Sequence, residues 1–349
     1  MILRNVRVVP HDSSWREMFL EEAERIAAVL GPQLVYLHHV GSTAVPELPA
    51  KPIIDMLLVV REIETVDRLA DGLAQRGYVG LGEYGLSGRR YFWKGQPEHR
   101  YHLHCYQWGN PAVERHLAFR DFLRASSPAA KEYGDLKQRL AQRHPQDIEA
   151  YMAGKDALVK AQEARALRWW SEVPVIIITG PTGVGKSTTA EALAGLFEEA
   201  HIAHWVMDVD RLTDVAPHAP GDRFRKGIVY AGLGQLWPVM RSAGTRLVIL
   251  PRVVESAEEA WHLGRSIPGG SPWVVRLTAL PATLERRISQ RESGESRDWH
   301  QARARELAAV FERVSVADLV ADTENQTPRQ VAERIWTRFR DRYPAFFVP

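Results

Sequence analysis

The stretch GPTGVGKS at residues 180–187 has the residue types and spacing of a phosphate-binding site. It follows the apolar run VIIIT and precedes STTAEALAGLFEEA, which has the composition of a helix. This order satisfies the pattern G-x-x-x-x-G-K-[ST], in which a glycine-rich loop between a strand and a helix holds nucleotide phosphates on its backbone N–H groups. The sequence therefore predicts a nucleotide-binding loop in the second half of the chain.

The residues of this loop have predictable tasks. Glycines let backbone N–H groups turn toward phosphate oxygens, the lysine reaches the β- and γ-phosphates of ATP, and the serine hydroxyl binds Mg²⁺. The alternative is a glycine turn that precedes a helix by chance. We expect the nucleotide and its metal to be bound by Gly180, Gly183, Gly185, Lys186, Ser187 and Thr188.

Two carboxylates follow on the next apolar segment. The run HWVMDVDRL places Asp208 and Asp210 at the end of a predicted strand, where alternate residues point to the same side. Ligands of open α/β sheets bind beyond the carboxyl ends of the strands, so both carboxylates are expected to face the phosphates. Asp208 would assist the metal, and Asp210 would orient or deprotonate an acceptor hydroxyl. The alternative is a polar loop in which Asp210 caps a helix.

An arginine-rich segment begins farther along the chain. The run VVRLTALPATLERRISQRESGESRDW predicts a strand, a turn, a helix and a charged excursion. Guanidinium groups that close over a transferring phosphoryl group stabilise its negative charge and exclude water. We expect Arg287 or Arg291 to act in this way. The alternative is a solvated helix face whose arginines pair with Glu285, Glu292 and Glu295.

Residues 174–341 resemble the P-loop kinase superfamily, particularly the adenylylsulfate kinase, shikimate kinase and antibiotic phosphotransferase types. The resemblance rests on GPTGVGKS, MDVD and ADTENQTP. It implies a parallel sheet with helices on both faces. It also implies that the last loop lies near the adenine, where Asp322 and Thr323 would border the base.

This sequence departs from the superfamily at one point. After a third predicted strand, TRLVIL, many P-loop hydrolases and kinases place an acidic residue that helps to bind magnesium. Here Pro251 and Arg252 follow that strand. The departure leaves Asp208 or Glu255 as the substitute.

The first half of the chain has its own chemically suggestive residues. In HHVGSTAVPELPAKPIIDMLLVV a predicted strand ends in Gly41 and Ser42, and a second strand carries Asp55. In RYHLHCY, His102 and His104 lie two residues apart on a predicted strand and project to one face. With Asp55 they would form a mixed nitrogen and oxygen site for a second divalent metal, or for acid–base chemistry. The alternative is that the histidines only hydrogen-bond inside a polar cleft.

Residues 7–170 resemble the GrpB family of predicted nucleotidyltransferases, through VGSTAVPELPAKPIID, GYVGLGEYGLSGRRYFWKG, YHLHCY and RHLAFRDFLRA. The resemblance implies a nucleotidyltransferase-like α+β domain in which Gly41 and Ser42 hold nucleotide phosphates. A two-metal nucleotidyltransferase needs two carboxylates at alternate positions of one strand. Here the run is Asp55-Met56-Leu57, so the second carboxylate is absent.

Positive charge lies near these residues along the chain. Lys51, Arg89, Arg90 and Arg120 are candidates for the site of the first half. Arg120 belongs to ERHLAFRDFLRA, where cationic residues recur at helical spacing and either face a phosphate or form one charged helix face. We prefer an anionic ligand. The aromatic residues Trp15, Phe92, Trp93 and Trp108 are expected in the core or in domain contacts rather than in stacking on nucleic-acid bases.

Length and composition limit the class of protein. The chain has 349 residues, 45% of them hydrophobic and 25% charged, with a net charge of +2. This describes a globular protein of two domains, expected at 1–170 and 171–349, with no nucleic-acid partner. A single cysteine, no signal-peptide pattern at the start and no apolar run of about 18 residues favour a cytoplasmic protein without a membrane span.

We therefore expect an α/β enzyme of two domains. The P-loop domain would transfer the γ-phosphate of ATP to a small-molecule acceptor, with Mg²⁺ as cofactor, and the GrpB-like domain would bind or further modify the acceptor. One alternative is a nucleotidyltransferase that uses Ser42, Asp55 and the histidine pair. Another is a non-catalytic, ATP-gated accessory protein. The sequence determines neither the acceptor nor the oligomeric state.

Overall fold

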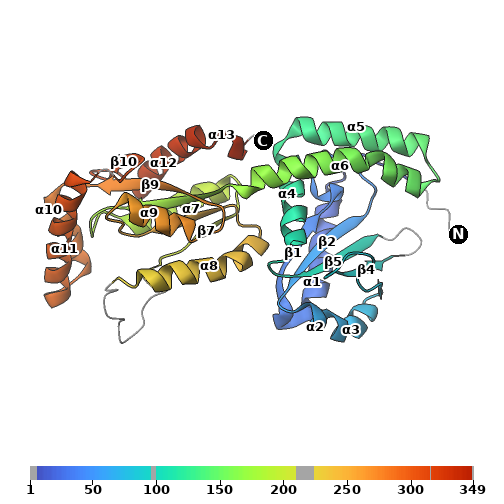
Figure 1. Cartoon of the computed structure of the whole chain (residues 1–349), viewed down its shortest axis with the longest axis horizontal. Helices are drawn as coiled ribbons and strands as arrows, with labels where there is room; N and C mark the ends of the chain where they lie inside the picture. Colours follow the sequence, from blue (N-terminus) through green and yellow to red (C-terminus); the bar gives the residue numbers. More distant parts are fainter. Residues whose placement is uncertain (1–5, 96–99, 210–223, 315, 348–349) are drawn as a thin grey trace. The chain divides into compact units, whose positions relative to one another are not determined.

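The computed structural model describes residues 6–95, 100–209, 224–314 and 316–347 (Figure 1). The chain forms two compact units, one built mainly on the described part of Met1–Trp170 and the other on that of Ser171–Met240 and Thr245–Pro344. Each unit has a five-stranded sheet covered by helices. The predicted fold class, an α+β unit followed by a parallel sheet with helices on both faces, is confirmed.

The first unit combines helices with a mixed sheet. Its elements are α1 (Ser14–Leu30), η1 (Gly31–Gln33), β1 (Leu34–Val40), η2 (Ser42–Ala44), β2 (Ile54–Val60), α2 (Ile63–Arg68), α3 (Ala70–Ala74), β3 (Tyr78–Gly80), β4 (Arg90–Lys94), β5 (Tyr101–Gln107), α4 (Pro111–Ala125), α5 (Ser127–Arg143) and α6 (Ile148–Ser171). The strand order is β1-β2-β5-β4-β3, and β2 runs parallel to β5 while the other neighbours are antiparallel.

One face of this sheet packs on α1, α2 and α3. Side chains alternate along a strand, so Met56 and Leu58 of β2 share this face with Leu103 and Cys105 of β5. Trp15 of α1 belongs to the same apolar cluster, as does Phe92 of β4. The expectation that these two aromatic residues are core residues is confirmed.

The opposite face of the sheet packs on α4, α5 and α6. Leu57 and Val59 of β2 belong to this second cluster, and Figure 1 shows α5 and α6 running side by side along it. The register of β2 and β5 aligns Asp55 with His102 and Leu57 with His104. The three polar side chains therefore lie on the face that α4–α6 cover.

The long helical region before the second unit is divided into two helices. The sequence between Lys131 and Trp170 predicts a continuous helical region, whereas α5 ends at Arg143 and α6 begins at Ile148. His144 precedes Pro145, and the ring of a proline disfavours helical dihedrals in the residue before it. The composition predicted helix correctly, and Pro145 sets the break.

The second unit is an open parallel sheet. Its elements are β6 (Val173–Thr179), α7 (Lys186–Glu199), β7 (His204–Val206), α8 (Lys226–Ser242), β8 (Leu247–Pro251), α9 (Ala257–Arg265), β9 (Gly270–Thr278), α10 (Pro281–Arg291), α11 (Gly294–Arg313), β10 (Leu319–Asp322) and α12 (Pro328–Arg342). The short helix α13 (Pro344–Phe347) follows α12 in the chain. The strand order is β10-β9-β6-β8-β7, and all neighbouring strands are parallel.

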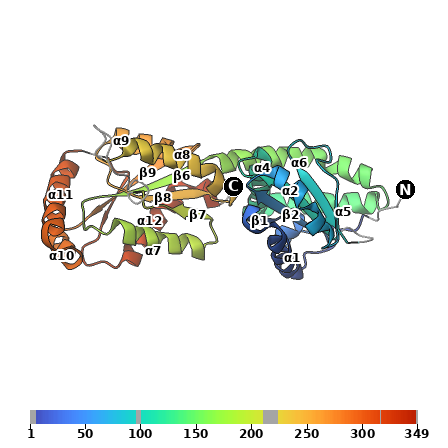
Figure 2. The ribbon, with the colours of Figure 1, turned by 90° about the horizontal axis from the view of Figure 1, so that it is seen from below.

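The central strand β6 is buried along its whole length. Figure 2 shows α8 and α9 on one face of the sheet, α7 and α12 on the other, and α10 and α11 beyond the end of the sheet. Burial on both faces explains why β6 is a continuous apolar run rather than an alternating one. Strand order reverses at β6, which pairs with β8 on one side and β9 on the other, so its carboxyl end is the expected ligand site of such a sheet.

None of the helices in the described ranges is both long enough and apolar enough to cross a membrane.

A buried carboxylate ties α1 to the sheet of the first unit. The Glu22 side chain is fully buried and accepts hydrogen bonds from Lys94 Nζ at 2.6 Å, from the Tyr78 hydroxyl at 2.9 Å and from Arg25 at 3.0 Å. Burial by itself raises the pKa of Glu22, but these hydrogen bonds outweigh burial and hold the pKa below its usual value. The charged form of Glu22 therefore stabilises this unit.

Glu22→Gln is expected to lower the free energy of unfolding of the first unit by about 2–4 kcal/mol at pH 7, because it leaves Lys94 without its carboxylate. A lowered folded-state pKa stabilises above the unfolded-state pKa, and that stabilisation is lost as the pH falls through the folded-state pKa. The difference between the two proteins should therefore shrink at about pH 3. Pulsed hydrogen exchange across a urea series, read on peptides of β2 and β5, measures this unit separately.

The control is Glu24→Gln on the exposed side of α1, which should change the unfolding free energy by no more than about 0.5 kcal/mol. If Glu22→Gln lowered the unfolding free energy by the same amount at pH 7 and at pH 3, the result would contradict the proposal that the charge of Glu22 stabilises this unit.

Candidate functional sites

The P-loop joins β6 to α7 with three glycines in conformations that other residues avoid. The φ angles of Gly180, Gly183 and Gly185 are 142°, 83° and 98°. A Cβ atom on Gly180 would lie 2.6 Å from the Leu277 carbonyl oxygen of β9, and one on Gly183 would lie 2.9 Å from Ile288 of α10. Close packing against neighbouring elements thus requires these two glycines, in addition to the turn that the motif predicts.

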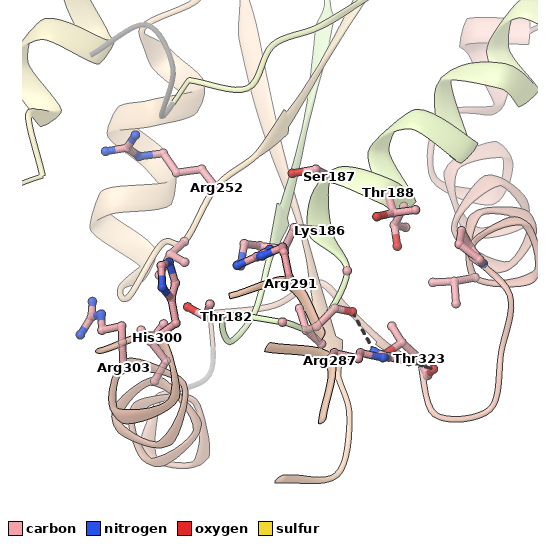
Figure 3. A pocket seen from close by; sticks show the side chains of 18 of the residues that line it. Thr182, Lys186, Ser187, Thr188, Arg252, Arg287, Arg291, His300, Arg303 and Thr323 are labelled. Atoms are coloured by element: carbon pink, nitrogen blue, oxygen red, sulfur yellow. Dashed lines mark hydrogen bonds between the residues drawn. The ribbon is translucent and has the colours of Figure 1, made fainter. Parts of the chain in front are cut away.

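The P-loop opens into a cavity of about 740 Å³ (Figure 3). Its described walls include the P-loop and α7, the segment after β8 with the start of α9, α10 and α11, and the residues after β10 with the start of α12. Among the described residues that line it, two are glutamates, Glu255 and Glu259, and five are cationic: Lys186, Arg252, Arg287, Arg291 and Arg303. The excess of positive charge in a concave site suits a polyphosphate.

Backbone carbonyl groups hold several of these cations. Lys186 Nζ donates to the carbonyl oxygens of Gly180 and Pro181, at 3.0 and 3.1 Å. Arg252 donates to the Phe224 carbonyl at 2.9 Å. These carbonyl groups help to hold the cationic side chains in defined orientations in the cavity.

The two arginines predicted from the sequence have different surroundings. Arg287 donates to the hydroxyl and to the carbonyl of Thr323, both at 3.0 Å, and so joins α10 to the segment after β10. Arg291 is more exposed and pairs with Glu292 at 2.9 Å, as the solvated-helix alternative predicts, although it also lines the cavity. Figure 3 shows Arg287 next to Thr323.

The other residues that were predicted to bind the nucleotide differ in whether they line the cavity. Ser187, Thr188 and Thr323 line the cavity. Asp322 is not among the described residues that line it, and its carboxylate accepts the Glu324 N–H at 3.1 Å. The structure therefore turns Thr323 toward the cavity and uses Asp322 in a local turn.

The segment after β8 brings a carboxylate to the cavity. The Arg252 N–H donates to the Ile178 carbonyl at 3.0 Å, and the Val254 N–H donates to the Thr179 hydroxyl at 3.0 Å. These bonds fix the segment along the end of β6, and Glu255 follows directly. Glu255 pairs with Arg303 of α11, and both line the cavity.

The predicted carboxylates on the β7 side are placed differently. Asp208 is not one of the described residues that line the cavity, and Asp210 lies outside the described residues. Sequence reasoning missed Arg303 and Glu259, because no local pattern marks them. The S-x-x-E pattern of Ser256 and Glu259, in which the serine hydroxyl accepts the Glu259 N–H at 3.1 Å, predicts a helix start but not a cavity wall.

A second group of polar side chains gathers in the first unit. Asp55 Oδ1 lies 3.3 Å from His102 Nδ1 and 3.6 Å from His104 Nε2. One ligand atom from each residue lies within 4.8 Å of the other two. The side chains of Asp55, His102 and His104 are 29%, 19% and 15% exposed, so the cluster is accessible from solvent.

Neighbouring groups fix this cluster. Burial raises the pKa of the Asp55 carboxyl, but its interactions with His102 and His104 outweigh burial and hold that pKa well below its usual range. The Tyr91 ring packs 5.6 Å from the His102 ring and 5.3 Å from the His104 ring. Burial lowers the pKa of His116, whose ring lies 5.4 Å from that of His104, well below its usual value. Asp55 is therefore the anionic member of the group.

The loop after β1 approaches Asp55 closely. Gly41 has a φ of 71°, and a Cβ atom there would collide with the Asp55 carboxylate. Ser42, the next residue of this loop, hydrogen-bonds to the Tyr133 side chain. That hydrogen bond lowers the pKa of Tyr133, but burial outweighs it and raises the pKa to about 12. The glycine is thus required by the packing of the carboxylate, whether or not the loop also holds phosphate.

Two arginines that were expected in the site of the first unit hydrogen-bond to groups outside the Asp55, His102 and His104 cluster. Arg90 makes two hydrogen bonds of 2.7 Å to Asp67, and the register sets it opposite Cys105, on the other face of the sheet from His102 and His104. The expectation that Arg90 adds charge to this site is corrected. Arg120 donates to the His39 carbonyl at 3.2 Å, so it contacts the backbone of β1 just before the loop that begins at Gly41.

Arg89 and Lys51 also have defined surroundings. The Arg89 side chain is buried, donates to the carbonyls of Glu83 and Tyr84 at 3.2 and 2.7 Å, and lies over the Tyr91 ring. It therefore supports the aromatic ring that packs on the histidines. Lys51 Nζ lies 5.6 Å from the centre of the Tyr151 ring.

Comparisons with known proteins assign the first unit to a family. The family model described as GrpB protein matches residues 5–165. The UPF0157 protein YqkA of Bacillus subtilis is 48% identical over 166 residues, which are 48% of this chain and 48% of YqkA. This chain thus spans about half the length of YqkA.

Two further relatives differ in how much of their length is matched. A dephospho-CoA kinase of Mycolicibacterium paratuberculosis is 28% identical over 189 residues, covering 47% of this chain and 46% of the relative. The UPF0157 protein BH1888 of Halalkalibacterium halodurans is 36% identical over 163 residues, covering 46% of this chain and 83% of the relative. Given that identity over most of BH1888 and the family match, this chain belongs to the GrpB family.

Proposed function

We propose that the second unit is an ATP- and Mg²⁺-dependent phosphotransferase that acts on a small metabolite. The main support is the P-loop at the carboxyl end of the central strand β6, which opens into a cavity with five cationic side chains. The parallel sheet with helices on both faces is the architecture of P-loop kinases. A cavity of about 740 Å³ has room for a nucleotide and a small acceptor.

In this proposal the residues of the P-loop bind the nucleotide. Lys186 leaves the carbonyls of Gly180 and Pro181 and binds the β- and γ-phosphates, while Ser187 binds Mg²⁺. Glu255 takes the place of the acidic residue that is missing after β8, because it lines the cavity where Asp208 does not. Thr323 borders the base.

The transfer step needs an acceptor oxygen and fixed positive charge. The acceptor oxygen forms a bond to the γ-phosphorus while the bond to the bridging oxygen breaks, and ADP leaves with that electron pair. Arg287, Arg291 and Arg303 are placed to stabilise charge on the transferring group. Asp210 remains the predicted base that accepts the acceptor's proton.

The role of the GrpB unit is part of the same proposal. It binds the acceptor, modifies it further or stabilises the kinase, in a cytoplasm that supplies ATP. A nucleotidyltransferase in the first unit has less support, because the position for a second carboxylate is Leu57, a fully buried residue of the apolar cluster under α4–α6.

Lys186→Ala is expected to reduce the rate of phosphate transfer at least about 100-fold. The substitution removes a cation that would stabilise the negative charge of the γ-phosphoryl group in the transition state. The full-length protein is incubated with Mg²⁺, ATP and fractions of a cell extract, and mass spectrometry identifies a metabolite that gains one phosphate. Lys160→Ala, which removes an exposed lysine paired with Asp156, is the control and should leave the rate unchanged.

Two other results would favour the alternatives. A metabolite that gains a nucleotidyl group, with release of pyrophosphate and with loss of the reaction in Asp55→Ala, would assign the chemistry to the first unit. ATP binding without turnover in every fraction would favour an ATP-gated accessory protein.

Glu255→Gln is expected to raise the Mg²⁺ concentration for half-maximal transfer about tenfold, because an amide oxygen is a weaker magnesium ligand than a carboxylate. Glu258→Gln is the matched control, since Glu258 is 83% exposed and near in sequence. The rate is measured across a Mg²⁺ series at saturating ATP. A lower rate with an unchanged Mg²⁺ midpoint would contradict metal binding, and would mean that Glu255 only positions Arg303.

A further inference from the structure

The proposed phosphotransfer leaves the Asp55, His102 and His104 cluster without a task. Asp55 lies on β2 and both histidines lie on the neighbouring parallel strand β5. The register aligns Asp55 with His102, and His104 follows two residues later on the same face. Three potential metal ligands thus meet on rigid strands rather than on loops, which keeps their geometry defined before a ligand binds.

The distances within the cluster are long for hydrogen bonds. Hydrogen bonds between nitrogen and oxygen are about 2.7–3.2 Å long, whereas Asp55 Oδ1 lies 3.3 Å from His102 Nδ1 and 3.6 Å from His104 Nε2. If the histidines served only to hydrogen-bond the carboxylate, shorter distances would be expected. These separations are at the long end of hydrogen bonding, so they leave more space between the three ligand atoms than short hydrogen bonds would.

The same distances fit a shared metal ion. Two ligand atoms that each lie about 2.0–2.1 Å from a tetrahedral zinc ion are about 3.3 Å apart. Both separations from Asp55 are close to this value, and all three ligand atoms lie within 4.8 Å of one another. Binding would therefore need only a small inward movement of the imidazole rings.

The ligand set also selects the kind of metal. Two imidazole nitrogens and one carboxylate oxygen suit zinc and other first-row transition ions, whereas Mg²⁺ and Ca²⁺ prefer oxygen ligands alone. Three protein ligands leave a fourth position open, as in catalytic rather than structural zinc sites. The remaining exposure of the three side chains gives an ion and a further ligand a route to the site.

Residues around the cluster hold the Asp55, His102 and His104 side chains in place. Gly41 lies so close to the Asp55 carboxylate that any other residue would displace it. Tyr91 packs against both imidazole rings and is itself covered by the buried Arg89 side chain. These contacts fix the orientation of ligand side chains in the way that outer contacts do at metal sites.

We propose that Asp55, His102 and His104 bind one divalent transition-metal ion, Zn²⁺ foremost, with a fourth coordination position open to water or to an oxygen of a small ligand. The site lies entirely within the GrpB unit. The proposal does not rest on the phosphotransferase activity of the second unit.

Co²⁺ titration of the metal-free, full-length protein tests the proposal, without nucleotide so that the P-loop does not bind metal. We expect one equivalent of Co²⁺ to bind with the intense visible absorption of a four-coordinate ion, and Zn²⁺ to displace it. Asp55→Asn, His102→Gln and His104→Gln should each weaken binding at least about tenfold. His144→Gln, outside the cluster, and Lys186→Ala should bind as the unchanged protein does.

A measurement on the unchanged protein covers the case in which a variant fails to fold. X-ray absorption of the zinc-loaded protein should give nitrogen and oxygen neighbours at about 2.0 Å, with the scattering pattern of two imidazole rings. Stoichiometric binding that survives all three cluster substitutions, no binding by the unchanged protein, or an absorption spectrum without imidazole would each overturn the proposal. Loss of transfer in Lys186→Ala with retained Co²⁺ binding would separate this site from the kinase.

Discussion

Parallel pairing of buried strands is the constraint on which both units depend. Parallel neighbours need long crossover connections, so the residues that they align come from distant parts of the chain. In the first unit β2 and β5 align Asp55 with His102, and in the second β6 pairs with β8 and β9 around the P-loop. In the first unit, a shift of one residue along β5 would turn His102 and His104 to the opposite face of the sheet, away from Asp55.

Five cationic side chains of the described residues line the P-loop cavity. Like charges in one cavity repel one another, and their desolvation is unfavourable. Lys186, Arg252 and Arg287 all donate to backbone carbonyl oxygens, which partly compensate this unfavourable energy. In the proposed function, a bound polyphosphate would add negative charge to this cavity and so reduce the repulsion between its cations.

Two carboxylates of the first unit, Glu22 and Asp55, are stabilised in different ways. Glu22 is buried with several donors and remains charged, and it joins α1 to β4 without access to solvent. Asp55 is also charged, but its neighbours are two imidazoles, 3.3 and 3.6 Å away, and part of the site remains exposed. The first arrangement is typical of structural stabilisation, whereas the second leaves room for a ligand.

The sequence alone determined the local elements. The motif GPTGVGKS predicted a glycine turn between a buried strand and a helix, and the spacing of His102 and His104 predicted a shared face. These predictions succeed because they depend on the periodicity of one element or on a turn whose glycines are visible in the sequence.

Only the tertiary structure decided which distant side chains meet. Arg303 reaches the cavity because α11 lies against it, and Arg90 leaves the cluster of the first unit because its register places it opposite Cys105 and beside Asp67. Local sequence gives the direction of a side chain relative to its own strand or helix. It does not give the register between strands or the packing of one helix against a distant loop, and those two quantities decide the composition of both sites.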